Sequence, residues 1–181
     1  MPERHFTQAR IVNALQALGN ELTSRGVRGQ VFIVGGAAMA LAYSTRRVTK
    51  DIDAVFEPKS AVYAAAGKVA DELGLPEDWL NDAVKGFMPG PDEDPRPVPN
   101  IPGIEVTTAS PRYLLAMKLM AMRFGEDDED IRILLAASGT GSTHEALDLL
   151  KAVYPHKEPP AKTRFFLEEL LGASRPRSPG A

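Results

Sequence analysis

The 181-residue sequence contains no cysteine, and this absence limits both its covalent framework and its chemistry. Disulfide bonds, thiolate catalysis and zinc sites built on cysteine are excluded. The chain also lacks an apolar run of about 18 residues, the length that a membrane-spanning helix needs. Asn13 and Gln16 interrupt the pattern that would follow a signal-peptide start. We therefore expect a cytoplasmic protein that does not enter a membrane.

An excess of one charge is also missing, because 21 Lys and Arg residues nearly balance 24 Asp and Glu residues. The formal net charge of -3 provides no global attraction to nucleic acid. A local basic patch that binds nucleic acid is still compatible with the sequence. The residues that could form it lie near one another in sequence and are Arg25, Arg28, Arg46, Arg47 and Lys50. The length and the 44% hydrophobic content predict one globular domain over residues 1–181.

The order of the predicted elements indicates an α+β fold with a small sheet flanked by helices. Hydrophobic periodicity predicts three strands, at residues 31–34, 52–56 and 104–108. It predicts helices at residues 5–25, 60–73, 111–123, 126–137, 143–153 and 161–171. The sheet core would occupy residues 28–110, the C-terminal helices 111–172 and a frayed tail 173–181. Closely spaced prolines predict a long mobile loop over residues 88–103.

Asp51 and Asp53 stand at the start of the second predicted strand. Their side chains project to the same side of the strand and lie about 7 Å apart along it. Like charges this close repel unless a cation lies between them, and Mg²⁺ binds one or two carboxylates together with substrate phosphates. Solvated acids, or ion pairs with Arg46, Arg47 or Lys50, are the structural alternative. We favour a metal site, because Asp is disfavoured inside strands.

Gly35 and Gly36 follow the first predicted strand and precede a helix of small residues. Such a pair permits a tight turn that needs a positive φ or close packing. The N–H groups that begin the next helix, at the positive end of its dipole, are also suited to bind a phosphate. Both roles are compatible. The motifs of a Walker A loop and of a dinucleotide-binding fold are absent.

Lys118 is the only charged residue between residues 113 and 122, in an otherwise apolar helix. It is either a lysine that reaches out to solvent or one held over the metal site, where it would neutralise phosphates. Asp127 and Asp130 share one helical face, which Ile131 continues into the core. Acids on such a face need partners, and Lys118 is the natural one.

Glu105 stands among apolar and hydroxyl residues on the third predicted strand. It is the best candidate for a third carboxylate of the metal site. A role as an ordinary acidic residue on an edge strand would explain it equally well. His5, His144 and His156 show no ligand spacing, so we assign them no function.

Together these features resemble the polymerase-β-like nucleotidyltransferase superfamily, whose signature is Gly-Gly or Gly-Ser, a helix and then Asp-x-Asp on a strand. More closely, the chain resembles the minimal bacterial branch that includes the AbiEii and MenT toxins. The matching pieces are Gly35-Gly36, Arg47-x-Thr49-x-Asp51-Ile52-Asp53, Leu115-Ala116-Met117-Lys118-Leu119 and Asp127-x-x-Asp130-Ile131.

The resemblance implies a mixed sheet flanked by helices and transfer of a nucleotidyl group from an NTP, dependent on Mg²⁺ or Mn²⁺. It implies that Asp51 and Asp53 bind the metal and that Asp130, with Asp127 a further candidate, completes the site. The residues expected at the nucleotide phosphates are Gly35, Gly36, Arg47, Thr49 and Lys118. In the related toxins the acceptor is the 3′ end of tRNA, and a cognate antitoxin controls the activity. The resemblance therefore implies tRNA and an antitoxin protein as candidate partners.

We therefore expect an enzyme that transfers NMP from an NTP to a hydroxyl acceptor. The alternative is a catalytically degenerate protein of the same fold that acts as a nucleotide-binding or partner-binding module. An inactive descendant should have lost part of the acidic complement. The presence of Asp51, Asp53, Lys118 and Asp130 favours the enzyme.

Overall fold

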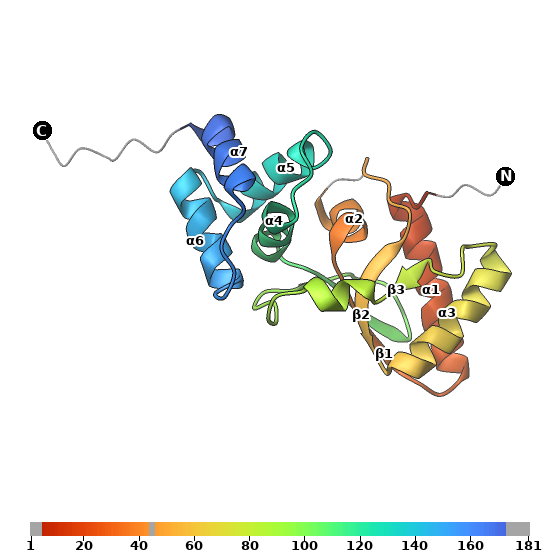
Figure 1. Cartoon of the computed structure of the whole chain (residues 1–181). Helices are drawn as coiled ribbons and strands as arrows, with labels where there is room; N and C mark the ends of the chain where they lie inside the picture. The colour runs from red at the N-terminus through yellow and green to blue at the C-terminus, as the bar shows by residue number, and fades with distance from the viewer. Residues whose placement is uncertain (1–4, 44–45, 173–181) are drawn as a thin grey trace, which may run out of the picture. The chain divides into compact units, whose positions relative to one another are not determined.

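The computed structural model describes residues 5–43 and 46–172 (Figure 1). The predicted tail, 173–181, lies outside the described residues. The chain divides into two compact units, one formed by Met1–Met88 with Asp92–Ser110 and the other by Pro89–Pro91 with Pro111–Ala181. We call them the sheet unit and the helical unit. Within the described residues, no helix is both long enough and apolar enough to span a bilayer.

The sheet unit contains a five-stranded mixed sheet, which confirms the predicted α+β class. Its spatial order is β3-β2-β1-β5-β4. The strands are β1 (Gly29–Ile33), β2 (Ile52–Glu57), β3 (Leu80–Asn81), β4 (Arg96–Pro97) and β5 (Ile104–Thr108). The central strand β1 pairs antiparallel with β2 and parallel with β5, while β3 runs parallel to β2 and β4 antiparallel to β5.

Two helices, α1 (Gln8–Ser24) and α3 (Lys59–Leu73), pack side by side against one face of this sheet (Figure 1). Alternate strand residues face them and form the core, among them Val31, Ile33, Ile52, Ala54 and Val106. The other residues of each strand belong to the opposite face, where they are half-buried or exposed. We call this the open face, and it carries Asp53.

A short helical segment connects β1 to the second strand. It consists of α2 (Gly35–Ala38), which continues as one turn of π-helix, η1 (Met39–Tyr43). The chain then returns past Thr49, whose backbone exchanges two hydrogen bonds with Phe6, at 2.6 and 3.1 Å. A 3-10 turn, η2 (Ala83–Phe87), follows β3.

The proline-rich segment after Met88 is not the free loop that its composition predicts. It contains β4, and the Val98 N–H donates to the Val106 carbonyl at 2.8 Å. Asp92 accepts hydrogen bonds from the Ser110 N–H at 2.6 Å and from its hydroxyl at 2.7 Å. Prolines lack an N–H group, but the carbonyls and the remaining N–H groups suffice to fasten the segment at these points.

The helical unit consists of α4 (Pro111–Met120), α5 (Asp128–Ser138), α6 (Thr143–Val153) and α7 (Ala161–Leu171). The sequence-based helix at 111–123 extends three residues too far, and the one at 126–137 begins two residues too early. The Ser142 hydroxyl caps α6 by accepting from the Glu145 N–H at 3.2 Å. The buried Thr163 hydroxyl donates to the Leu119 carbonyl at 2.7 Å and so joins α7 to α4.

Candidate functional site

The two acids of the Asp-x-Asp motif lie at the beginning of β2. Asp51 directly precedes the strand and Asp53 is its second residue, and both side chains are half-buried. Asn81 on β3 is the strand partner of Asp53, and its Nδ2 donates to Oδ2 of Asp51 at 3.2 Å. One amide therefore holds the first carboxylate beside the second.

Burial and then the negative charge of Asp51 raise the pKa of Asp53, and the Asn81 amide only partly opposes them. Among the residues that the structure describes, no Lys or Arg forms an ion pair with Asp51 or Asp53. The ion pairs with Arg46, Arg47 or Lys50 that would have explained the two acids are therefore not formed. Within residues 5–43 and 46–172 the pair is a concentration of negative charge that no Lys or Arg balances through an ion pair.

Gly35 and Gly36 bring the start of α2 against these acids. Gly35 has a φ of +62°, and a Cβ atom there would lie 3.3 Å from Oδ2 of Asp53. A Cβ atom on Gly36 would lie only 2.8 Å from Oγ1 of Thr49. The left-handed backbone and the close approach both require glycine, so the turn predicted from the sequence is confirmed.

The start of α2 supplies backbone donors beside these carboxylates. The preceding residue, Val34, is extended and provides no side-chain cap. The first N–H groups of a helix have no acceptor within that helix. Thr49 lies against Gly36 and its hydroxyl donates to the Asp51 carbonyl at 3.1 Å, so it supports the same turn. Arg47, which we expected at the phosphates, is half-buried in the segment that leads to Asp51 and β2.

Glu105 does not join the aspartate pair, because strand register places it near the opposite end of the open face. Gln30 of β1 pairs with Glu57 on one side and with Glu105 on the other. Asp53 precedes Glu57 by four residues, which corresponds to about 13 Å along the strand. The structure therefore does not support Glu105 as a third carboxylate of this site.

Lys118 lies in a second cluster, inside the helical unit. Its Nζ is 2.7 Å from Oδ1 of Asp127 and 2.8 Å from Oδ2 of Asp130. The Lys118 side chain is 13% exposed, and those of Asp127 and Asp130 are 5% and 3% exposed. The prediction that Lys118 is the partner of the two acids is confirmed.

Asp127 also organises the turn between α4 and α5. Its Oδ2 accepts a hydrogen bond from the Arg123 N–H at 2.9 Å. Burial by itself would raise the pKa of Asp127, but the hydrogen bonds from Lys118 and from Arg123 outweigh burial, so the pKa is lowered. Asp127 is therefore a carboxylate held ionised by its partners.

Asn81 is the site residue that the sequence reasoning missed. It follows Trp79 and Leu80, which are both buried, and the Trp79 indole N–H donates to the Ala66 carbonyl at 3.0 Å. The Trp79 carbonyl accepts from the Ile52 N–H at 2.7 Å, which brings β3 alongside β2. A polar amide directly after two large apolar residues was the available signal.

The aspartate pair suits a cation that is shared with a substrate. No group of three or more His, Asp or Glu side chains in the described parts of the chain could hold a metal ion. Mg²⁺ characteristically takes one or two carboxylates and completes its coordination with water and phosphate oxygens. Two uncompensated carboxylates next to backbone N–H donors fit that mode of binding.

A protein-family model described as "Nucleotidyltransferase of unknown function (DUF6036)" matches residues 10–154, a range that contains both clusters. No curated protein and no solved structure matches the chain. The family match does not extend to the branch of the AbiEii and MenT toxins.

Proposed function

This chain belongs to a nucleotidyltransferase family, and we propose that it transfers an NMP group from an NTP to a hydroxyl acceptor. The observation that carries the proposal is the charge imbalance at Asp51 and Asp53. Two half-buried carboxylates, close enough for one to raise the pKa of the other, lie beside a glycine turn that begins a helix. This combination favours a divalent cation with attached phosphates.

Residues of the sheet unit would bind the NTP, which donates the NMP group, and the metal ion that accompanies it. Asp51 and Asp53 would hold Mg²⁺ or Mn²⁺, and Asn81 would orient Asp51. When bound, the metal ion would polarise the α-phosphate and balance the charge of the triphosphate. Gly35 and Gly36 keep side chains away from the start of α2, so that phosphate oxygens can approach its N–H groups.

In the proposed reaction a hydroxyl oxygen of the acceptor forms a bond to the α-phosphorus. The bond from the α-phosphorus to the bridging oxygen breaks, pyrophosphate leaves and the hydroxyl proton passes to solvent. Positioning of the reacting groups and preorganised charge would supply most of the rate enhancement.

Lys118 would act in this scheme as a phosphate-binding residue. An ammonium group has three N–H donors, and one of them donates to Asp127, while Asp130 forms an ion pair with the same nitrogen at 2.8 Å. A remaining donor is suited to a phosphate oxygen. The two aspartates would then position Lys118 and keep it charged.

The direct test incubates the protein with α-labelled ATP, GTP, CTP and UTP in turn, with Mg²⁺ and either total RNA or a protein and small-molecule extract. We expect one of these acceptors to become labelled. Label in the 3′ end of tRNA would support the tRNA acceptor that the sequence led us to expect.

Asp51→Asn should abolish the transfer without unfolding the protein, because it changes one oxygen for an amide on a half-buried residue. Asp71→Asn is the matched control, since Asp71 is exposed on α3 and should leave transfer unchanged. Transfer that persists in Asp51→Asn would contradict the metal-binding role.

A catalytically degenerate binding module is the second candidate. It is favoured by the register of Glu105, which leaves the aspartate pair without a third carboxylate on that strand. Calorimetry with each NTP, with and without Mg²⁺, separates the two candidates when it is combined with the transfer assay. Mg²⁺-dependent NTP binding without any labelled acceptor would support the module.

A further inference from the structure

Phe6 is a buried residue of the sheet unit, and no step of the proposed reaction uses it. It forms an isolated β-bridge with Thr49, although the sequence predicts that a helix begins at residue 5. The side chain is fully buried, and the residue lies outside residues 10–154, the range of the family match. A phenyl ring neither binds a metal ion nor exchanges a proton. Any effect of Phe6 on the site must therefore pass through the residues that it contacts.

The backbone of Phe6 fastens the segment that leads to the first carboxylate. Its N–H donates to the Thr49 carbonyl at 2.6 Å, and its carbonyl accepts from the Thr49 N–H at 3.1 Å. Thr49 precedes Asp51 by two residues, and its hydroxyl donates to the Asp51 carbonyl at 3.1 Å. The same hydroxyl lies against Gly36 of the glycine turn. Phe6 therefore fixes the path by which the chain enters the aspartate pair.

The ring of Phe6 contacts a second segment, the one that leads to Asn81. It stacks on the Trp79 ring, with the centroids 6.4 Å apart and the planes inclined at 26°. Trp79 precedes Asn81 by two residues, and its carbonyl accepts from the N–H of Ile52, between the two aspartates, at 2.7 Å. Asn81 in turn donates to Oδ2 of Asp51 at 3.2 Å. The donor and the acceptor of this hydrogen bond thus belong to two segments that meet at Phe6.

Residues next to Phe6 in the chain hold it in this position. The Thr7 hydroxyl caps α1 by accepting from the Arg10 N–H at 3.3 Å. The Arg10 guanidinium lies 5.1 Å from the centroid of the Phe6 ring. The Gln8 amide donates to the Leu41 carbonyl of η1 at 3.2 Å. Phe6 is therefore anchored by the first turn of α1, which also contacts the helical segment that follows the glycine turn.

We infer that Phe6 is a positioning residue of the aspartate site. Its backbone holds residues 49–51 and its ring holds residues 79–81. The Asn81 amide thereby stays on Asp51, and both carboxylates stay in place for one divalent cation. Precision matters, because Mg²⁺ demands near-ideal octahedral geometry and a displacement of about 0.5 Å disturbs a binding site. The role in metal binding rests on the proposed function, whereas the alignment of Asn81 with Asp51 does not.

Calorimetric titration of the full chain with Mg²⁺, in the absence of NTP, tests this role. Phe6→Ala should weaken Mg²⁺ binding about five-fold, less than Asn81→Ala does, because the amide is still present but less well aligned. Phe6→Leu keeps most of the apolar volume and should weaken binding about three-fold, and it provides the test if Phe6→Ala does not fold. Leu15→Ala is the matched control, since Leu15 is a fully buried residue of α1. This control should unfold at a lower urea concentration and still bind Mg²⁺ with wild-type affinity.

A second measurement depends on neither metal nor nucleotide. NMR of the isotope-labelled, metal-free protein observes the side-chain amide of Asn81, whose signal is identified by its loss in Asn81→Ala. In both Phe6 variants this signal should move toward the position of a free asparagine amide, because the hydrogen bond to Asp51 is formed for a smaller fraction of the time. The signal should not move in Leu15→Ala.

A double variant separates positioning from general stability. Combining either Phe6 substitution with Asn81→Ala should weaken Mg²⁺ binding by less than the product of the two single effects, because both act on one hydrogen bond. Single effects that multiply, an unchanged Mg²⁺ affinity in both Phe6 variants, or an equal loss in Leu15→Ala would overturn the inference. A wild type that binds no Mg²⁺ would refute the proposed metal site instead. The Asn81 signal would then still decide whether Phe6 aligns the amide.

Discussion

Asn81 of β3 donates a hydrogen bond to Oδ2 of Asp51 across the strand pair, at 3.2 Å. The short strand β3 thus sets the orientation of the first carboxylate of the motif, while no Lys or Arg in the described part of the chain forms an ion pair with Asp53 beside it.

Asn81→Ala should weaken Mg²⁺ binding and lower nucleotidyl transfer, each by about ten-fold or slightly more. The substitution removes one hydrogen bond to a charged group, an interaction worth about 1.5 kcal/mol or slightly more. Calorimetric Mg²⁺ titration and the labelled-NTP assay measure the two effects. Asn20→Ala, at an exposed position of α1, should match the wild type in both. An Asn81→Ala variant with unaltered Mg²⁺ affinity would show that Asp51 needs no orientation by the amide.

Gly36→Ala should destabilise the sheet unit by about 1–3 kcal/mol, because the new methyl group meets the Thr49 hydroxyl at 2.8 Å. Urea unfolding measures the loss. Adding Thr49→Ala should recover part of it, since the two side chains would be coupled through one contact. Gly67→Ala is the control, because no atom lies within 4 Å of its Cβ position and helix propensity should raise its stability slightly. Additive effects of the Gly36 and Thr49 substitutions would contradict the contact.

Asp53→Asn should raise the free energy of unfolding of the metal-free protein at neutral pH. The folded protein raises the pKa of Asp53, first through burial and then through Asp51, so the ionised group opposes folding. Its favourable contribution is present below the unfolded pKa of about 3.9 and is lost as the pH rises through the raised folded pKa. The advantage of the variant should therefore grow above pH 4 and vanish in stronger acid.

Urea unfolding of wild type and Asp53→Asn over a pH series measures this difference. Added Mg²⁺ should stabilise only the wild type and thereby reduce the advantage of the variant. If the difference in the free energy of unfolding between the two proteins stays constant with pH, folding does not raise the pKa of Asp53.

Lys118→Met should destabilise the helical unit by about 3–5 kcal/mol, because it leaves two buried carboxylates without their cation. The lowered pKa of Asp127 gives this cluster the opposite pH dependence to Asp53. Its stabilising effect is present above the unfolded pKa and is lost as the pH falls through the lowered folded pKa.

Thermal or urea unfolding of Lys118→Met should therefore show its largest deficit near neutral pH. Lys151→Met, at an exposed position of α6, serves as the control and should cost less than about 0.5 kcal/mol. Replacing Asp127 and Asp130 with Asn in the Lys118→Met background should recover stability. A Lys118→Met variant as stable as the wild type would contradict the structural importance of the cluster.

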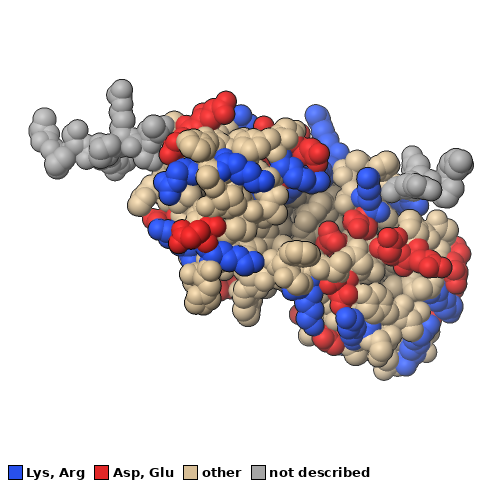
Figure 2. Space-filling model, viewed as in Figure 1, with Lys and Arg blue, Asp and Glu red and all other residues tan. Residues whose placement is uncertain are grey.

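The composition gives the number of charged residues but not the places where their side chains lie. Figure 2 shows Lys and Arg interspersed with Asp and Glu on the face that it displays. The net charge of -3 already argued against a global footprint for nucleic acid. The composition also hides that Glu57 and Glu105 lie in one row, because they are 48 positions apart in the chain and strand pairing brings them together through Gln30.

Features that depend on neighbours in the chain were predictable from the sequence. The two-residue period of a strand puts Asp51 and Asp53 on one side, and the glycine pair at the end of β1 makes a turn with a positive φ. The pairing of Lys118 with Asp127 and Asp130 was also foreseeable, because an apolar helix and an apolar helical face each carried charge that required a partner.

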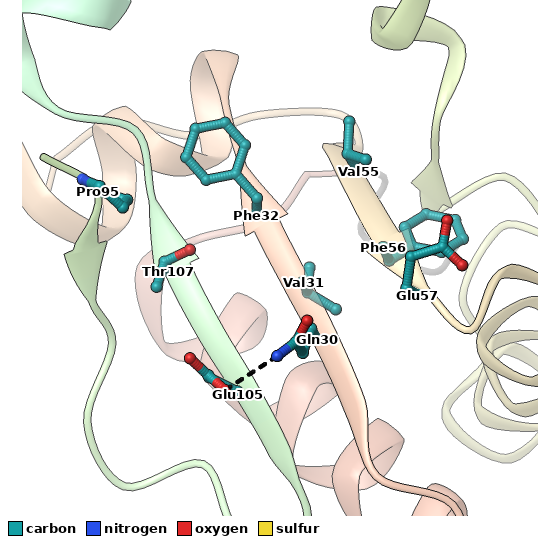
Figure 3. Close-up of a pocket in the computed structure, with 9 residues that line it drawn as sticks. All are labelled: Gln30, Val31, Phe32, Val55, Phe56, Glu57, Pro95, Glu105 and Thr107. Carbon is teal, nitrogen blue, oxygen red and sulfur yellow. Dashed lines mark hydrogen bonds between the residues drawn. The ribbon is translucent and has the colours of Figure 1, made fainter. Parts of the chain in front are cut away.

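The tertiary structure alone decided features that depend on which strands pair and in what register. Antiparallel pairing of β1 with β2 and parallel pairing with β5 moves Glu105 to the far end of the open face, where it lines a hollow of ≈ 330 Å³ instead of joining the aspartates (Figure 3). The burial of Trp79 draws β3 beside β2 and thereby gives Asp51 its Asn81 partner. Local periodicity determines the direction of a side chain from its own strand, whereas the residues it meets depend on long-range packing and hydrogen bonding.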